Sequence, residues 1–188
     1  MLSKILGLLN KIVYKLKCGN KVSFSGIPRF VSHMQIYVES GKVEVGKSFS
    51  MKEGTYIAAV NGGKITIGDD VAINRNCILV SHDSIMISNN CRIGPNVVFY
   101  DHNHRFGMNG VEDGYTHAPI VVERNCWIGA GVTVLKGTRI GEGSVIGAGV
   151  IVQGDIPPHS LVTTNRELYI TPIVSNREKN EIERDLKS

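Results

Sequence analysis

Four of the six histidines in this 188-residue chain lie between positions 82 and 117. Two of them, His102 and His104, belong to the tetrapeptide Asp101-His102-Asn103-His104, which directly follows the apolar run Val97–Tyr100. Histidine has an unperturbed pKa of about 6.5, so it can accept and return a proton near neutral pH. If Asp101 or a backbone carbonyl held one ring nitrogen of His102, the other could act as a general base toward a hydroxyl or an amine.

A six-residue repeat provides the framework that would hold these side chains. Apolar residues recur at every sixth position toward the C-terminal end, and a second set of apolar or small residues follows each by four positions. The first set is Ile128, Val134, Ile140, Ile146 and Val152, and the second is Val132, Thr138, Ser144, Val150 and Ile156. Neither a helix nor a strand has this period. A parallel β-helix does, because each hexad forms one short strand and a turn.

Shorter runs with the same spacing precede this array, and the phase changes between runs, which indicates extra residues at corners of the coil. The largest interruption lies between Phe99 and Val122, where three glycines and Pro119 indicate a flexible excursion that returns to the sheet. A long glycine-containing loop inside a compact domain is usually functional. We therefore expect the loop 103–119 to shape a binding site beside His102.

The N-terminal segment is expected to form a separate element. Residues 2–16 place apolar side chains at helical spacing with lysines mostly on the other side, which predicts an amphipathic helix. The favoured interpretation is a helix that covers the open end of the solenoid, since terminal coils need covering. The alternative is a peripheral contact with an anionic membrane surface. The segment lacks a small-residue cleavage site, and no stretch approaches the ~20 apolar residues of a membrane span.

The bulk composition bounds the class of protein. Hydrophobic residues make up 42% and charged residues 20%, which is typical of a soluble, ordered chain. The net charge of +4 is mild and no dense basic run appears beyond the N-terminal lysines, so we expect no nucleic-acid partner. The four cysteines form no CxxC pair. Cys77, Cys91 and Cys126 fall on the inward positions of hexads, which favours buried side chains in a reducing cytoplasm over disulfides or metal ligands.

These patterns predict three segments. Residues 1–22 hold the amphipathic helix, 23–162 form an all-β parallel β-helix that contains the excursion, and 163–188 form a short C-terminal tail. The last coil ends at Pro157 and Pro158, because proline cannot donate a hydrogen bond to a strand ladder.

The chain resembles the left-handed β-helix acyltransferases of the hexapeptide-repeat superfamily, and most of all the branch that holds galactoside and maltose acetyltransferases and polysaccharide O-acetyltransferases. The resemblance covers roughly residues 60–160. It is most specific from Cys126-Trp127-Ile128-Gly129-Ala130-Gly131-Val132 to Asp155-Ile156-Pro157-Pro158. It implies the left hand of the coil, which periodicity leaves open. It also implies a homotrimer with acetyl-CoA sites between neighbouring solenoids.

The resemblance further implies roles for individual residues. The catalytic histidine of the family falls on His102, and its acceptor-binding asparagine falls on Asn74, with Asn76 as a near second candidate. Both asparagines are equally compatible with a side-chain ladder at a corner of the coil. The small residues that contact CoA in the family fall on Ala130 and Ala148, where the pantetheine arm could lie along the coil.

Further contacts are expected from the neighbourhood of these residues. Trp127, the only tryptophan, would pack against the cofactor arm or face the neighbouring subunit. In the excursion, Glu112, Asp113 and Tyr115, together with His104, are candidate hydrogen-bond partners of sugar hydroxyls.

Two departures from the family concern the far end of the cofactor. Gln153-Gly154 stands where the family has Thr-Lys, and residues 163–166 replace the stretch that usually follows the last coil. The adenine and phosphate end of CoA would therefore be held differently. Lys136, Arg139 and Arg166 could substitute by their charge.

The function implied by the resemblance is acetyl-CoA-dependent O-acetylation of a sugar hydroxyl in surface polysaccharide biosynthesis, in the cytoplasm or at the inner face of the membrane. N-acetylation of an amino sugar or another small acceptor is the alternative, and the acyl group itself stays open. The alternative from a different class of enzyme is a γ-carbonic-anhydrase-like metalloenzyme in which His82, His102 and His104 bind zinc. The spacing of these histidines does not resemble that family. A non-catalytic solenoid would be supported by a regular outward array of threonines, and the sequence shows none.

Overall fold

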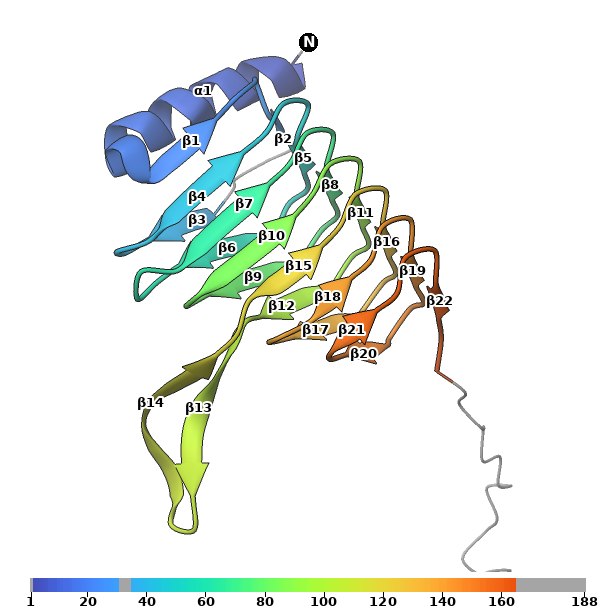
Figure 1. The fold of residues 1–188 in the computed structure, drawn as a ribbon. Helices are drawn as coiled ribbons and strands as arrows, with labels where there is room; N and C mark the ends of the chain where they lie inside the picture. Colours follow the sequence, from blue (N-terminus) through green and yellow to red (C-terminus); the bar gives the residue numbers. More distant parts are fainter. Residues whose placement is uncertain (1, 31–34, 165–188) are drawn as a thin grey trace, which may run out of the picture.

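The computed structural model describes residues 2–30 and 35–164, so nearly all of the C-terminal tail predicted for 163–188, Arg166 included, lies outside the described residues. Successive strands visit three parallel sheets in turn and build a solenoid below an N-terminal helix (Figure 1). The predicted left-handed parallel β-helix is confirmed. The expectation rested on the six-residue repeat for the coil and on the family resemblance for its hand.

Each of the three sheets runs along the whole solenoid. Sheet A contains β1 (Val22–Phe24), β4 (Lys42–Val45), β7 (Lys64–Ile67), β10 (Ser84–Ile87), β15 (Ile120–Val122), β18 (Arg139–Ile140) and β21 (Asp155–Ile156). Sheet B contains β2 (Arg29–Phe30), β5 (Ser50–Met51), β8 (Ala72–Ile73), β11 (Arg92–Ile93), β16 (Trp127–Ile128), β19 (Val145–Ile146) and β22 (Leu161–Val162). Sheet C contains β3 (Gln35–Val38), β6 (Tyr56–Ala59), β9 (Ile78–Ser81), β12 (Val98–Tyr100), β17 (Thr133–Leu135) and β20 (Ile151–Val152).

The length of the coils explains why the repeat is regular only near the C-terminal end. There Val121 pairs with Arg139, 18 positions later, so that three hexads fill one coil. Nearer the N-terminus Lys42 pairs with Lys64, 22 positions later. In these longer coils β4 and β7 of sheet A and β6 of sheet C have four residues each. The changes of phase in the sequence therefore reflect longer coils as well as one large insertion.

The core is a stack of inward side chains from all three sheets. Ile128, Val134, Ile140 and Ile146 have no exposed surface, as the first set of the repeat requires. The three cysteines on the repeat are also buried, as predicted. The buried hydroxyl of Ser144 donates a hydrogen bond to the carbonyl of Pro157 at 3.0 Å, so a polar side chain at a corner is satisfied by the next coil.

The helix α1 (Leu2–Cys18) and a single 3₁₀ turn, η1 (Gly19–Lys21), precede the first coil, and α1 packs on β1 and β2. The helix ends two residues later than the predicted range 2–16. Within residues 2–30 and 35–164, no helix is long and apolar enough to cross a membrane.

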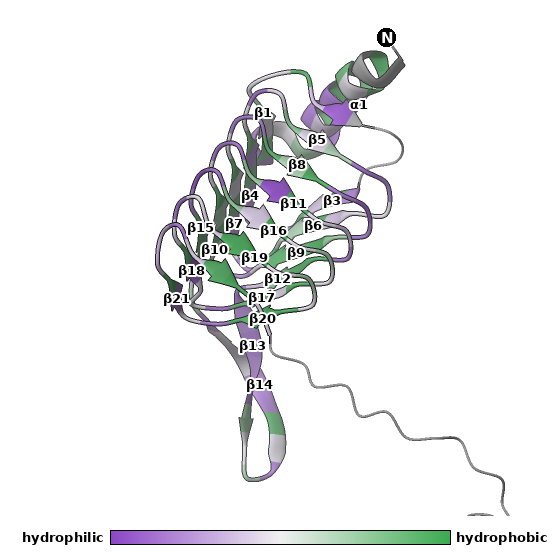
Figure 2. Cartoon of the chain, turned by 90° about the vertical axis from the view of Figure 1, so that its right-hand side faces the viewer, coloured by the Kyte–Doolittle hydropathy of each residue, from purple (hydrophilic) through white to green (hydrophobic). Residues whose placement is uncertain are grey.

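The excursion between β12 and β15 is a two-stranded antiparallel hairpin that projects from the solenoid (Figures 1 and 2). Its strands are β13 (His102–Gly107) and β14 (Gly110–His117), which pair His102 with His117. The sequence led us to expect a flexible loop. The glycines serve a more specific purpose, because Gly110 and Gly114 have φ of 97° and 92°, values that favour glycine at the tip and at a bulge of the hairpin.

Candidate active site

A buried carboxylate anchors His102 at the base of the hairpin. Asp101 has no exposed surface, and its oxygens accept hydrogen bonds from the Ser81 hydroxyl at 2.7 Å and from the backbone amides of His82 at 2.8 Å and Asp83 at 2.9 Å. The Nδ1 atom of His102 lies 3.1 Å from Asp101 Oδ1. Because a carboxylate only accepts, this contact places the proton on Nδ1 and leaves the Nε2 lone pair as the basic site.

Aromatic rings enclose the imidazole of His102 on several sides. The ring of His82 stacks on it with centroids 3.7 Å apart and planes 18° apart. Tyr100 and Tyr115 approach it edge-on, at centroid distances of 5.7 and 5.6 Å. The side chain keeps only 13% of its surface exposed. A ring that is packed in this way and bonded at one nitrogen has a fixed orientation, which is what proton transfer to a bound acceptor requires.

The stacked partner is neutral at neutral pH. Partial burial, and after it the nearby His102, lower the pKa of His82 from its usual value. Its Nδ1 atom lies 3.1 Å from the side-chain nitrogen of Asn61. His82 therefore supports His102 as an uncharged ring and does not place a positive charge beside it.

This lowered pKa makes the stability of the fold dependent on pH. As the pH falls below about 6.5, the unfolded chain binds a proton at His82 before the folded chain does. The contribution of uncharged His82 to the free energy of unfolding is therefore complete above that pH and is lost as the pH falls. The substitution His82→Phe keeps a stacking ring and removes the titration. We expect thermal unfolding at about pH 5.5 and pH 7.5 to differ less for this variant than for wild type. An unchanged difference between the two pH values would contradict this assignment.

The other candidates on the hairpin gather around the same corner. His104 lies against Tyr115, with ring centroids 4.7 Å apart. The Nζ atom of Lys136, in the turn between β17 and β18, hydrogen bonds to the hydroxyl and carbonyl of Thr116 and so supports the base of the hairpin. Glu112 is exposed and pairs in register with Arg105, farther out along the hairpin.

A second group of candidates lies at another corner of the coil, where sheet B leads into sheet C. Asn74 follows β8 and lines a surface pocket of about 440 Å³ together with Trp127, whose side chain is 58% exposed on sheet B. Ala130 and Ala148 are exposed in the turns that follow β16 and β19. Asn76 has a φ of 57°, a left-handed conformation that asparagine tolerates well, so it is a corner residue.

The two groups do not meet within one chain. His102, His104, Tyr115 and Lys136 lie where sheet C leads into sheet A. Asn74, Asn76, Trp127, Ala130 and Ala148 lie on sheet B or where it leads into sheet C. The whole width of sheet C separates the corners. A site that uses residues of both groups therefore needs a second copy of the chain.

The stacking role of His82 and the contact of Ser81 with Asp101 were not anticipated. Their signal was present in the spacing, because His82 precedes His102 by 20 positions and this coil pairs Val80 with Tyr100, also 20 positions apart. Coil register alone places the two histidines one above the other. Among the residues that the structure describes, no group of three or more His, Cys, Asp or Glu side chains is arranged to hold a metal ion.

A family model for bacterial transferase hexapeptide repeats, six in number, matches residues 119–154. This match covers β15 to β20, where the coils are most regular. The resemblance to hexapeptide-repeat acyltransferases is confirmed. Among curated proteins, this chain is 42% identical over 104 residues to a "Putative acetyltransferase" of Schizosaccharomyces pombe, and the match covers 53% of this chain and 49% of that protein. A protein of the same name from Staphylococcus aureus is 45% identical over 105 residues, with 55% and 53% covered.

The solved structures that match this chain also include acetyltransferases. A hexapeptide-repeat acetyltransferase from Vibrio cholerae, complexed with acetyl-CoA, matches with 27% identity and a TM-score of 0.51, over 73% of this chain and 65% of that one. A galactoside acetyltransferase in complex with CoA matches with 28% identity and a TM-score of 0.52, over 73% and 60%. An N-acyltransferase from Bacillus cereus has the same fold at 16% identity, with a TM-score of 0.66 over 94% and 97%. The chain spans about half the length of the curated relatives it matches.

Proposed function

We propose that the protein transfers the acetyl group of acetyl-CoA to a sugar hydroxyl and that His102 is the general base. The observation that carries the proposal is the Asp101–His102 pair, held rigidly at the base of a hairpin on a hexapeptide solenoid. Two structural relatives of this solenoid are acetyltransferases with acetyl-CoA or CoA bound. Acetyl-CoA is accordingly the proposed donor, with surface polysaccharide biosynthesis as the setting and an amino sugar nitrogen as the alternative acceptor.

The chemistry follows from the state of the imidazole. His102 Nε2 removes the proton from the acceptor hydroxyl while the oxygen attacks the thioester carbonyl. The charge that develops on the ring is stabilised by Asp101, which lies 3.1 Å from Nδ1. The tetrahedral intermediate collapses as the C–S bond breaks, and the imidazolium returns its proton to the CoA thiolate. Proton and acyl group are both accounted for without a covalent enzyme intermediate.

The complete site in this proposal forms between two copies of a homotrimer. One copy supplies His102 from the corner between sheets C and A, and its neighbour supplies Asn74 from the corner between sheets B and C. This arrangement is supported by the separation of the two corners within one chain. Head-to-tail contact between different corners closes into a ring, as in cyclic oligomers.

The proposed cofactor contacts also come from both corners. The exposed Ala130 and Ala148 leave room for the pantetheine arm along the coil, and the exposed ring of Trp127 provides an apolar surface beside it. Lys136 is proposed as a cation for a CoA phosphate from the hairpin corner. It would have to exchange its bonds to Thr116 for that role.

The acceptor contacts proposed for the hairpin are Tyr115, His104 and Glu112. Tyr115 packs against both His102 and His104, so it borders the base directly. Asn76, the second candidate for an acceptor contact, is given no such role in this proposal, because its corner conformation accounts for its presence.

The experiment that tests the function is acetyl-CoA turnover, followed by thiol release, with and without a panel of free sugars, amino sugars and glycan fragments. The proposal predicts release that depends on the acceptor, and mass spectrometry of the product then separates an ester from an amide. Absence of release with every acceptor, together with no acetyl-CoA binding by calorimetry, would contradict it.

Two asparagines of one turn offer a matched pair of variants. If Asn74 contacts the acceptor or the oxyanion, Asn74→Ala lowers the turnover number by roughly 10²-fold, the effect of removing one such donor. Asn76→Gly keeps the left-handed corner and should leave turnover within about twofold of wild type. Steady-state kinetics of both variants shows which of the two asparagines contributes to turnover. Equal losses, or a loss confined to Asn76→Gly, would contradict the assignment of Asn74.

A further inference from the structure

The helix α1 turns its apolar side away from the solenoid. The side that packs on the first coil is formed by Gly7, Tyr14 and the half-buried Cys18. A side chain at Gly7 would run into the carbonyl oxygen of Pro28, and the hydroxyl of Tyr14 accepts a hydrogen bond from the backbone amide of Ile36 at 3.1 Å. These contacts fix the rotation of the helix about its axis.

The opposite side of the helix is a continuous apolar stripe. Its members recur at intervals of three and four residues, which places them on one face, and between 41% and 81% of each side chain is exposed. They are Ile5, Leu8, Leu9, Ile12, Val13 and Leu16. At about 100° per residue, Leu16 lies some 160° from Tyr14 around the helix. The helix thus rests on the first coil with a narrow contact and leaves its large apolar side chains uncovered in the single chain.

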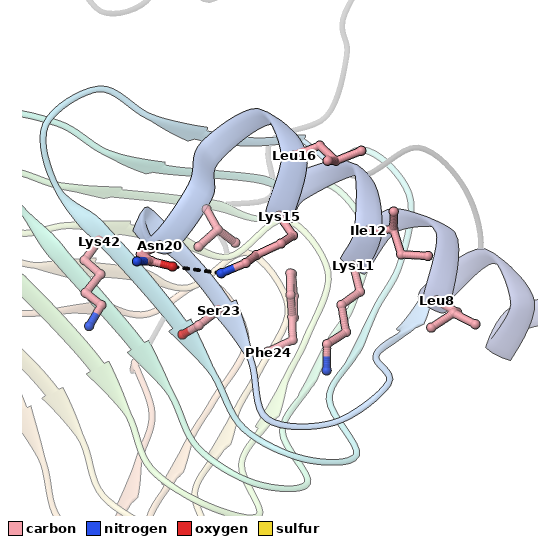
Figure 3. A pocket seen from close by; sticks show the side chains of 10 residues that line it. Leu8, Lys11, Ile12, Lys15, Leu16, Asn20, Ser23, Phe24 and Lys42 are labelled. Carbon is pink, nitrogen blue, oxygen red and sulfur yellow. Dashed lines mark hydrogen bonds between the residues drawn. The ribbon is translucent and has the colours of Figure 1, made fainter.

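Positive charge borders this stripe and extends onto the solenoid. A groove of about 790 Å³ lies between α1 and β1, with Leu8, Ile12 and Phe24 among its apolar side chains. Figure 3 shows Lys11 and Lys15 reaching from the helix toward β1, and Lys42 on the adjacent strand. These ammonium groups bond to Gly26, Asn20 and Glu44 respectively. Only Lys42 has a carboxylate partner among these contacts.

Charged residues are also distributed unevenly along the sequence, and the excess of basic residues falls at the N-terminal end. Residues 1–38 contain six Lys or Arg and no Asp or Glu, whereas the whole chain contains 21 and 17. Residues 39–188 therefore hold 15 basic and 17 acidic residues, a slight negative balance. The net positive charge of the protein is concentrated in the segment that carries the uncovered apolar stripe.

We propose that α1 and its lysine border bind the surface of an anionic lipid bilayer. The helix would lie parallel to the membrane, with the apolar stripe at the boundary between headgroups and acyl chains and the lysines among the phosphates. Apolar burial alone would suit a second protein copy equally well. The lysines of a helix that has no acidic residues favour an anionic surface, because they would repel the identical lysines of another copy.

The position of the helix is compatible with the candidate active site. The coil that ends in His102 is three coils below the one that α1 covers, a distance of about 15 Å at the usual strand spacing. An acceptor carried by a membrane lipid would then be within reach of the hairpin. The lipid contact itself does not depend on the proposed acetyl transfer, and its test uses no activity.

The test is flotation of the full-length protein with vesicles of phosphatidylcholine alone and with about 30% phosphatidylglycerol. We expect binding to the anionic vesicles, weak binding to the neutral ones and a strong reduction in about 0.5 M salt. The double variant Ile12→Asp/Leu16→Asp should lower the partition coefficient at least tenfold, because two apolar contacts become two negative charges. Lys11→Gln/Lys15→Gln should lower it for anionic vesicles only.

The matched control is Ile151→Asp/Leu161→Asp, which replaces two side chains of similar exposure, 69% and 72%, at the other end of the solenoid. It should bind vesicles as wild type does. Gel filtration of each variant shows whether the oligomer and the fold persist. Wild-type protein that fails to bind anionic vesicles overturns the proposal, as does equal binding of Ile12→Asp/Leu16→Asp. If there is no lipid binding and that variant dissociates the oligomer, a second copy covers the stripe instead.

Discussion

Replacement of His102 by alanine is expected to lower acceptor-dependent acetyl transfer by roughly 10²–10⁴-fold while the fold persists. The loss follows from the position of Nε2, the one basic nitrogen that the contact with Asp101 leaves available. Affinity for acetyl-CoA should change little, because His102 is not among the proposed cofactor contacts. Thiol-release kinetics and calorimetry measure the two quantities separately.

The control for this variant is His159→Asn. His159 lies in a turn of the last coil with a φ of 58°, a conformation that asparagine also adopts. The turnover number of His159→Asn should equal that of wild type. A His102→Ala protein that turns over at the wild-type rate would show that another group is the base.

Removal of the negative charge of Asp101 is expected to affect both stability and rate. In Asp101→Asn one of the two acceptor oxygens becomes a donor. It then faces either the Ser81 hydroxyl and the Asp83 amide, or the His82 amide and His102 Nδ1. At a fully buried position such a mismatch costs about 1–3 kcal/mol. The amide also no longer fixes the proton of His102 on Nδ1, so turnover should fall by about 10³-fold or more.

Thermal unfolding and the turnover number report these two effects independently. The matched control is Asp69→Asn, since Asp69 is exposed and accepts a single backbone hydrogen bond, from Lys47. It should change both quantities little. A variant at Asp101 that is destabilised but keeps full turnover would reduce this residue to a structural role.

The period of six was sufficient to predict the coil because each hexad places one large side chain in the same narrow core. Ile128 and Ile140 are fully buried for that reason. The pairing of Asp101 with His102 was also foreseeable, since the two are adjacent where a strand leaves the sheet. The stacking of His82 on His102 required knowledge of coil length. Outside the coil that contains the hairpin, this length varies between 16 and 22 residues, and it is obscured where the phase shifts.

Other features depend on contacts that no local pattern records. The hairpin was expected as a loop because its glycines suggested flexibility, whereas the pairing of β13 with β14 orders it. The amphipathic pattern of α1 predicted a helix that covers the open end of the solenoid, without indicating which side of the helix meets the first coil. Gly7 and Tyr14 decide that orientation, because they supply the close contact and the hydrogen bond to the first coil.

The central claim is that the site combines the base of one copy with the cofactor corner of its neighbour. It is tested most directly by mixing two inactive proteins. His102→Ala lacks the base, and Ala148→Trp, at an exposed position, blocks the proposed path of pantetheine. Equal amounts are denatured and refolded together, and acetyl transfer is measured against each variant refolded alone. Random assembly gives about one quarter of the sites an intact base next to an intact cofactor corner. The account predicts recovery of about one quarter of wild-type activity, and no recovery in mixed oligomers would contradict it.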